Sequence, residues 1–160
     1  MIATAAAALA LAAPAAAGLP RTGVLVPGSS LGGVRLGESP DAVRATLGSF
    51  YGRCTDCARP TWYFTVARFD KHGLAVEFTG RRVSAVYTLW EPPGWRTTTG
   101  LRLGASPLAV HRHVGFIQTF TCPGYDALVD DSRRVRTAFY LYQGSLWGFG
   151  LFRTADTPCR

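Results

Sequence analysis

The 160-residue sequence has only one lysine, Lys71, although its formal net charge is +7. The positive charge therefore comes from arginines, which are scattered along the chain and never follow one another in a run longer than two. No nucleic-acid-binding motif accompanies them, so the charge indicates solubility and nonspecific attraction. We expect no specific binding of nucleic acid.

Residues that carry catalysis or bind metals are also few. There are ten acidic residues, no Gly-x-Ser-x-Gly nucleophile motif and no phosphate-cradling loop. Two of the three histidines, His111 and His113, lie two positions apart on a predicted helix and so point in different directions. We expect no metal site and no cofactor. The sequence therefore favours a protein without catalytic activity. The alternative is a glycosidase, because two carboxylates far apart in the sequence could still form a catalytic pair.

A long apolar run occurs only at the start of the chain. Residues 1–17 are rich in alanine and leucine and end in small residues, a pattern typical of a signal peptide, although no basic residue precedes Arg21. An alanine-rich amphiphilic helix is the alternative. The run is too short to cross a bilayer comfortably, and no other segment is long enough, so we expect no membrane span. We predict a secreted or extracytoplasmic protein, as a monomer.

The four cysteines are Cys54, Cys57, Cys122 and Cys159. An even number in an exported chain predicts disulfides, with three possible connectivities. Pairing within each half of the chain is the simplest choice, and it would stabilise the protein by about 4 kcal/mol for the long loop and about 2 kcal/mol for the short one. The Cys-x-x-Cys spacing also suits dithiol exchange, but it follows a short helix in a loop rather than opening a helix after a strand, which favours a structural bond.

A segment of sixteen residues occurs in two similar copies. "GVRLGESPDAVRATLG" begins at Gly33 and "GLRLGASPLAVHRHVG" begins at Gly100, with nine of sixteen positions identical. Each copy predicts a short helix, with a serine cap (Ser39 or Ser106), a proline in the first turn and a closing glycine (Gly48 or Gly115). Helices of about two turns need tertiary packing to be stable in water.

Strand-like runs follow each predicted helix. They cover residues 61–67, 73–80 and 81–90 in the first half and residues 124–130, 136–142 and 145–152 in the second. We predict an α+β fold of two tandem units, each a short helix or helix pair packed on an antiparallel meander. The predicted divisions are a signal peptide (1–17), a first unit (18–90), a linker rich in proline and glycine (91–99) and a second unit (100–160).

The helix-entry motif Gly-Val/Leu-Arg-Leu-Gly-x-Ser-Pro-x-x-Val, duplicated in an exported chain and followed by antiparallel strands, resembles the β-lactamase inhibitory protein fold. It is also similar to the related single-unit outer-membrane assembly lipoproteins. The resemblance covers roughly residues 31–155 and implies two units with a concave protein-binding face. The chain lacks a lipobox, which argues against an outer-membrane assembly role. The inhibitor's target-contacting residues lie outside the motif, so none is transferred to this sequence.

Alternation along the predicted hairpins assigns side chains to two faces. The helix-facing core is expected to hold Leu74, Val76, Phe78, Val83, Ala85 and Tyr87 from the first hairpin, and Phe139, Leu141, Leu146, Gly148 and Gly150 from the second. The other face of the first hairpin would hold Glu77, Thr79, Ser84, Val86, Thr88 and Trp90. That of the second would hold Tyr140, Tyr142, Trp147, Phe149 and Leu151, which is too apolar for an idle solvated surface.

We therefore predict a non-catalytic binding protein, inhibitor-like or otherwise protein-binding, that uses this aromatic face. The candidate contact residues are Trp90, Tyr140, Tyr142, Trp147 and Arg153, since Tyr, Trp and Arg dominate interface energetics. The same pattern would arise if the two sheets packed against each other or if the register slipped by one residue. The alternatives in function are an enzyme with a carboxylate site between the units and a structural component of the cell envelope.

Overall fold

The structure is a computed structural model that describes Leu19, residues 22–115 and residues 117–160. The predicted signal peptide, residues 1–17, lies outside the described residues. The described residues form two short helices and eleven strands. In order they are β1 (Val24–Val26), β2 (Ser30–Leu31), α1 (Pro40–Leu47), β3 (Gly52–Cys54), β4 (Thr61–Thr65), β5 (Gly73–Thr79), β6 (Arg82–Leu89), β7 (Arg96–Thr97), α2 (Pro107–His113), β8 (Gln118–Cys122), β9 (Tyr125–Asp130), β10 (Val135–Tyr142) and β11 (Ser145–Arg153).

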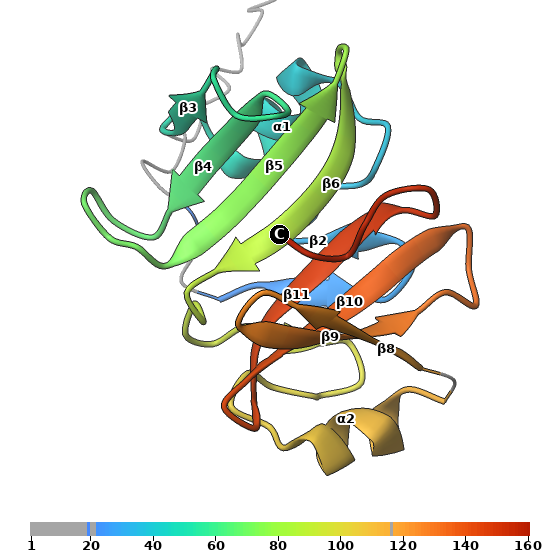
Figure 1. Cartoon of the computed structure of the whole chain (residues 1–160). Coiled ribbons are helices and arrows are strands. Elements are labelled where there is room, and N and C mark those ends of the chain that lie inside the picture. Colours follow the sequence, from blue (N-terminus) through green and yellow to red (C-terminus); the bar gives the residue numbers. More distant parts are fainter. Residues whose placement is uncertain (1–18, 20–21, 116) are drawn as a thin grey trace, which may run out of the picture.

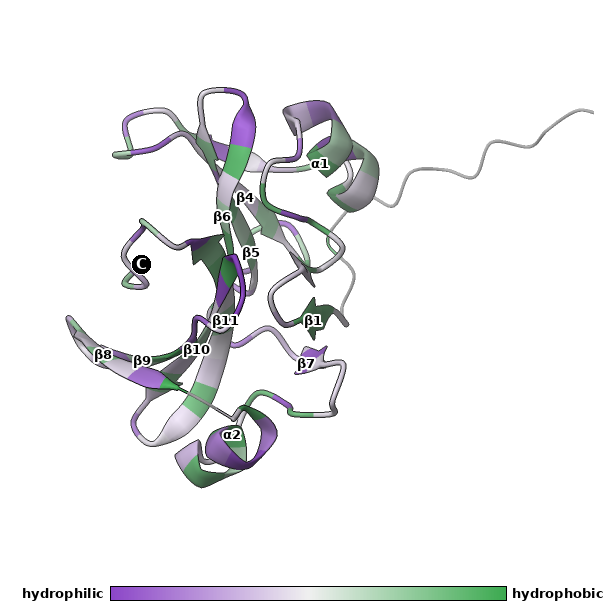
Figure 2. Cartoon of the chain, turned by 90° about the vertical axis from the view of Figure 1, so that its right-hand side faces the viewer, coloured by the Kyte–Doolittle hydropathy of each residue, from purple (hydrophilic) through white to green (hydrophobic). Residues whose placement is uncertain are grey.

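Eight of the strands form one continuous sheet in the order β3-β4-β5-β6-β11-β10-β9-β8 (Figure 1). Each half of the chain supplies a four-stranded meander, and the two meanders join where β6 pairs antiparallel with β11. The sheet is strongly curved. The helices and the small sheet β2-β1-β7 lie on its convex side, and the end of the chain lies on its concave side (Figure 2).

The two helices begin as the repeated motif predicts. The hydroxyls of Ser39 and Ser106 cap them by accepting hydrogen bonds from the backbone N–H three residues on, and a proline occupies the first turn of each. Helix α1 ends at Gly48 as expected, whereas the C-cap of α2 is Val114 rather than Gly115.

The predicted α+β class is wrong, because the fold is mainly β. The helices have only eight and seven residues, so each covers only part of the convex face. The small sheet and its connecting loops cover much of the rest. In particular Trp95, from the predicted linker, is 1% exposed and belongs to the same core cluster as Val43 and Val110 of the helices. The linker segment also contains β7, which pairs with β1.

The hairpin β5–β6 contains a β-bulge that the alternation rule does not foresee. Phe78 pairs with Val83 but Glu77 pairs with Ala85, so Ser84 is an extra residue in β6. An extra residue reverses the faces of all side chains beyond it. Ala85 and Tyr87 therefore belong to the concave face and Val86 to the convex core, the reverse of the prediction.

The hairpin β10–β11 has a bulge at the corresponding place. Leu141 pairs with Leu146 but Tyr140 pairs with Gly148, so Trp147 is the extra residue. Phe149 and Leu151 consequently lie in the convex core, where the prediction had placed the glycines. Gly148 and Gly150 instead lie against the ring of Tyr140. A Cβ added at Gly148 would lie 3.2 Å from that ring's Cδ2, and one added at Gly150 would contact its hydroxyl.

Candidate functional site

The concave face is occupied at its centre by residues 154–160, which we call the C-terminal segment. The disulfide Cys122–Cys159 joins this segment to the end of β8, and Pro158 is buried against the sheet. The hydroxyl of Tyr140 donates to the carbonyl of Pro158 at 3.1 Å, and that of Tyr125 donates to the carbonyl of Arg160 at 2.6 Å. The disulfide and two tyrosines thus hold the segment on β8, β9 and β10.

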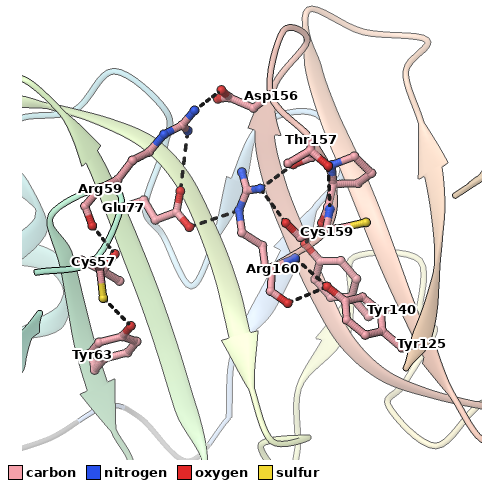
Figure 3. Close-up of polar contacts among 12 residues, drawn as sticks. Cys57, Arg59, Tyr63, Glu77, Tyr125, Tyr140, Asp156, Thr157, Cys159 and Arg160 are labelled. Carbon is pink, nitrogen blue, oxygen red and sulfur yellow. Dashed lines mark hydrogen bonds and ion pairs between the residues drawn. The ribbon is translucent and has the colours of Figure 1, made fainter. Parts of the chain in front are cut away.

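Ion pairs bind the same segment to the first half of the chain (Figure 3). The guanidinium of Arg59 lies 2.5 Å from a carboxylate oxygen of Asp156 and 3.6 Å from one of Glu77, and the Nε of Arg160 lies 3.2 Å from the other oxygen of Glu77. The side chains of Glu77, Asp156 and Arg160 are all nearly buried, with 12%, 12% and 10% exposed. The segment therefore bridges the two meanders across their junction.

The electrostatics of this bridge favour fixed charges. The hydrogen bond from Arg59 holds the pKa of Asp156 below its usual value, and Asp156 raises the pKa of Arg59 in return. Burial raises the pKa values of Tyr87 and Tyr140, with the neighbouring charge of Glu77 adding to the effect at Tyr87. Both tyrosines stay neutral near pH 7, and Tyr140 acts there as a hydrogen-bond donor.

An aromatic groove runs from the end of the C-terminal segment to the edge of the concave face. It consists of two cavities of about 250 and about 520 Å³ that share Trp90, Tyr125 and Trp147 as walls. Tyr142 completes the larger cavity and Arg160 closes the smaller one. The rings stand at steep angles to one another: Tyr125 and Trp147 at 79° with centroids 5.8 Å apart, and Tyr142 and Trp147 at 64° and 6.3 Å.

Polar groups lie at one rim of the groove. The ammonium of Lys71 lies 5.1 Å from the ring centroid of Trp90, a cation–π contact that fixes one side of the indole. His72 and Glu91 line the same cavity. Asp70 accepts hydrogen bonds from the backbone N–H of His72 at 2.8 Å, which lowers the pKa of Asp70, and its carboxylate also contacts Nδ1 of the imidazole.

The structure brings four of the five predicted contact residues to the groove, and three of these four are at least partly exposed. Trp90 and Tyr142 are 58% and 49% exposed, and Trp147 is half-buried between the two cavities. Tyr140 is only 3% exposed, since the C-terminal segment covers its hydroxyl, so it supports the groove from beneath. Arg153 is exposed at the far end of β11 from Trp147, outside the groove.

Sequence reasoning missed Tyr125, Arg160 and Lys71. The signal for Tyr125 was available, because it is the second residue of the predicted strand 124–130 and follows Pro123 and Gly124, residue types that are typical of turns. Arg160 offered no signal, since the path of residues 154–160 depends on which cysteines pair. Both disulfides join cysteines of the same half, Cys54 with Cys57 and Cys122 with Cys159.

The described residues contain no group of three or more His, Cys, Asp or Glu side chains that could hold a metal ion. His111 and His113 are exposed on α2, and Nδ1 of His113 contacts the carbonyl of Ala109 at 2.9 Å. Across the same described part of the chain, no helix has the length and hydrophobicity to cross a membrane. The two disulfides are consistent with an extracellular location.

The sequence matches no protein-family model and no curated protein. Among solved structures, the fold is similar to that of a DUF4309 family protein (YjgB) from Bacillus subtilis, with 15% identity over 73% of this chain and 79% of that one and a TM-score of 0.54. A second likeness, to an extracellular protein containing an SCP domain from Bacillus anthracis, has 10% identity over 74% of this chain and 44% of that one and a TM-score of 0.49.

Neither of these proteins is a β-lactamase inhibitory protein or an outer-membrane assembly lipoprotein, so the comparisons do not support the resemblance drawn from the helix-entry motif. What they show is a distant likeness of fold to the DUF4309 family protein.

Proposed function

We propose that this chain is an exported protein that binds another protein through the aromatic groove and catalyses no reaction. One observation carries the proposal: Trp90 and Tyr142 remain about half exposed and, with Trp147, line the larger of two cavities that share walls. Tryptophan and tyrosine supply most of the binding energy at protein interfaces when they stand in pockets of this kind. The two disulfides and the apolar start of the sequence support export.

The arrangement of carboxylates favours binding over catalysis. Glu77 and Asp156 lie at the junction of the two meanders, where the enzyme alternative would need them. Both are paired with arginines, and the lowered pKa of Asp156 keeps it ionised rather than available as a general acid. Their contacts are those of a clamp on the C-terminal segment, which supports a structural role for this pair.

The proposal is tested by capture of partners from the culture medium of the source. The mature protein is immobilised as wild type, as the double variant Trp90→Ala/Tyr142→Ala and as the control Leu108→Ala. Leu108 is 59% exposed on α2, on the convex side, and so matches the loss of exposed apolar surface without touching the groove. All three positions are exposed, and we expect little change in thermal stability.

We expect the double variant to capture at least about tenfold less of the partner than the wild type, as the loss of two interface anchors predicts. The control should capture it normally. Equal capture by the wild type and the double variant would contradict the proposal and favour a structural role in the envelope.

A further inference from the structure

The C-terminal segment shows how the concave face holds a peptide. Its carbonyls at Pro158 and Arg160, two residues apart, accept hydrogen bonds from the hydroxyls of Tyr140 and Tyr125. The hydroxyl of Tyr125 also accepts from the backbone N–H of Arg160 at 2.5 Å. Pro158 itself offers no N–H, so its carbonyl is the only backbone group there that needs a partner. The hydroxyl of Tyr140 therefore satisfies the only backbone hydrogen-bonding group of this proline.

The same kind of surface continues beyond the segment. Tyr125, which holds Arg160, is also a wall of both cavities, and the rings of Trp147, Tyr142 and Trp90 follow it to the edge of the concave face. The Tyr125–Trp147 and Tyr142–Trp147 pairs are steeply inclined, so the rings form ridges with slots between them. Slots between aromatic ridges are the shape that accepts the flat, compact pyrrolidine rings of an extended peptide.

We propose that the aromatic groove binds an extended, proline-containing segment of the partner protein, held as the concave face holds Pro158. This inference rests on the proposed function and names the chemistry of the partner. Such a segment has few N–H groups to satisfy and loses little conformational entropy on binding, because it is already extended. The groove matches it with apolar ring faces, and the cation of Lys71 at the rim complements the segment's exposed carbonyls.

The test is isothermal titration calorimetry of the mature, oxidised protein with blocked peptides of about nine residues, which span about 28 Å when extended in the polyproline II form. One peptide carries proline at two of every three positions, and its control has alanine in place of each proline. A chito-oligosaccharide of similar length is the third probe, because sugar rings also stack on exposed aromatic side chains. Each titration is repeated with Trp90→Ala, Tyr142→Ala and Leu108→Ala.

We expect saturable binding of the proline peptide, at least about tenfold tighter than that of the alanine peptide. Trp90→Ala and Tyr142→Ala should each weaken it by about fivefold or more, and Leu108→Ala by less than about twofold. Binding of the oligosaccharide alone, equal binding of the two peptides, or peptide binding that the groove variants leave unchanged would each overturn the inference. If the peptides fail while the double variant still loses its captured partner, the proposed function stands and only the chemistry assigned to the partner is wrong.

Discussion

The two halves of the sheet use matching positions for different purposes. Each half has an edge strand that ends in a cysteine, Cys54 in β3 and Cys122 in β8. In the first half this cysteine bonds within its own loop, to Cys57, whereas in the second it anchors the C-terminal segment through Cys159. One scaffold thus carries a closed loop at one edge and a segment laid across the concave face at the other.

The β-bulges at corresponding places allow the hairpins β5–β6 and β10–β11 to be compared residue by residue. Counting from each hairpin turn, Glu77 takes the place of Tyr140, and Tyr87 that of Gly150. The first half thus presents a carboxylate to the C-terminal segment, and the second presents a tyrosine whose ring lies over glycine. The two glycines of β11 leave room for the ring of Tyr140, which lines the smaller cavity of the groove.

The disulfides give the largest expected difference between the halves. Replacing Cys122 and Cys159 by serine removes a cross-link with a sequence separation of 37, whereas replacing Cys54 and Cys57 removes one with a separation of 3. The entropy of loop closure predicts a loss of about 4 kcal/mol in the free energy of unfolding for the first pair and about 2 kcal/mol for the second. Denaturant unfolding of the two double variants measures both. Equal losses would mean that the C-terminal segment is not held as described.

A smaller effect is expected at Gly150, which lies under the ring of Tyr140. A methyl group there would contact the Tyr140 hydroxyl and displace the ring from the carbonyl of Pro158. Overpacking of this kind typically costs about 2 kcal/mol. Gly52 in β3 is the matched control, since a Cβ there would meet nothing within 4 Å. Thermal unfolding of Gly150→Ala and Gly52→Ala measures the difference in stability between the two positions. If both variants were as stable as the wild type, the predicted contact between residue 150 and Tyr140 would be wrong.

The sequence supported local predictions better than distant ones. Capping serines, prolines and turn residues act over a few positions, so the helix starts, the hairpins and the strand-rich meanders could be predicted. The faces of Ala85, Tyr87, Phe149 and Leu151 could not, because the bulges at Ser84 and Trp147 insert one residue each with no distinctive side chain to announce them. A single insertion reverses every side chain that follows.

The placement of Arg153 has a related cause. It takes the position in the second half that Trp90 takes in the first, just after the residue that matches Leu89. Because β6 and β11 pair antiparallel, matching positions near the ends of these strands lie at opposite edges of the junction. Trp90 therefore reaches the groove and Arg153 does not. This relation depends on how the meanders join, which no local pattern specifies.

Acid sensitivity should distinguish the buried ion pair from an exposed one. Arg59 lowers the pKa of Asp156 in the folded state, so this carboxylate stabilises the protein above its unfolded pKa, and that stabilisation is lost as the pH falls towards the folded pKa. Asp156→Asn should lower stability near pH 7 by about 1.5 kcal/mol and flatten the decline in stability below about pH 4.

Asp41, 73% exposed in its pair with Arg44, is the control. Asp41→Asn should lower stability near pH 7 by no more than about 0.5 kcal/mol, as expected for surface pairs. If the free energy of unfolding of Asp156→Asn and of the wild type declined in parallel as the pH falls, the ion pair of Asp156 with Arg59 would not stabilise the folded protein.

The smallest expected effect compares the backbone at the exits of β6 and β11, that is, at Glu91 and Thr154, the second residue position after the matching residues Leu89 and Phe152. Glu91 has φ of 52°, in the left-handed region that favours glycine, whereas its match, Thr154, is not among the described residues with positive φ. Glu91→Gly should therefore be about 1 kcal/mol more stable than Glu91→Ala. At the second exit the order should reverse, with Thr154→Gly about 0.5–1 kcal/mol less stable than Thr154→Ala. Comparing glycine with alanine at one position cancels the lost side-chain contacts, including the hydrogen bond from Thr154 to the carbonyl of Arg134. The same order at both exits would show that the chain does not leave β6 in the left-handed turn that carries Trp90 to the groove.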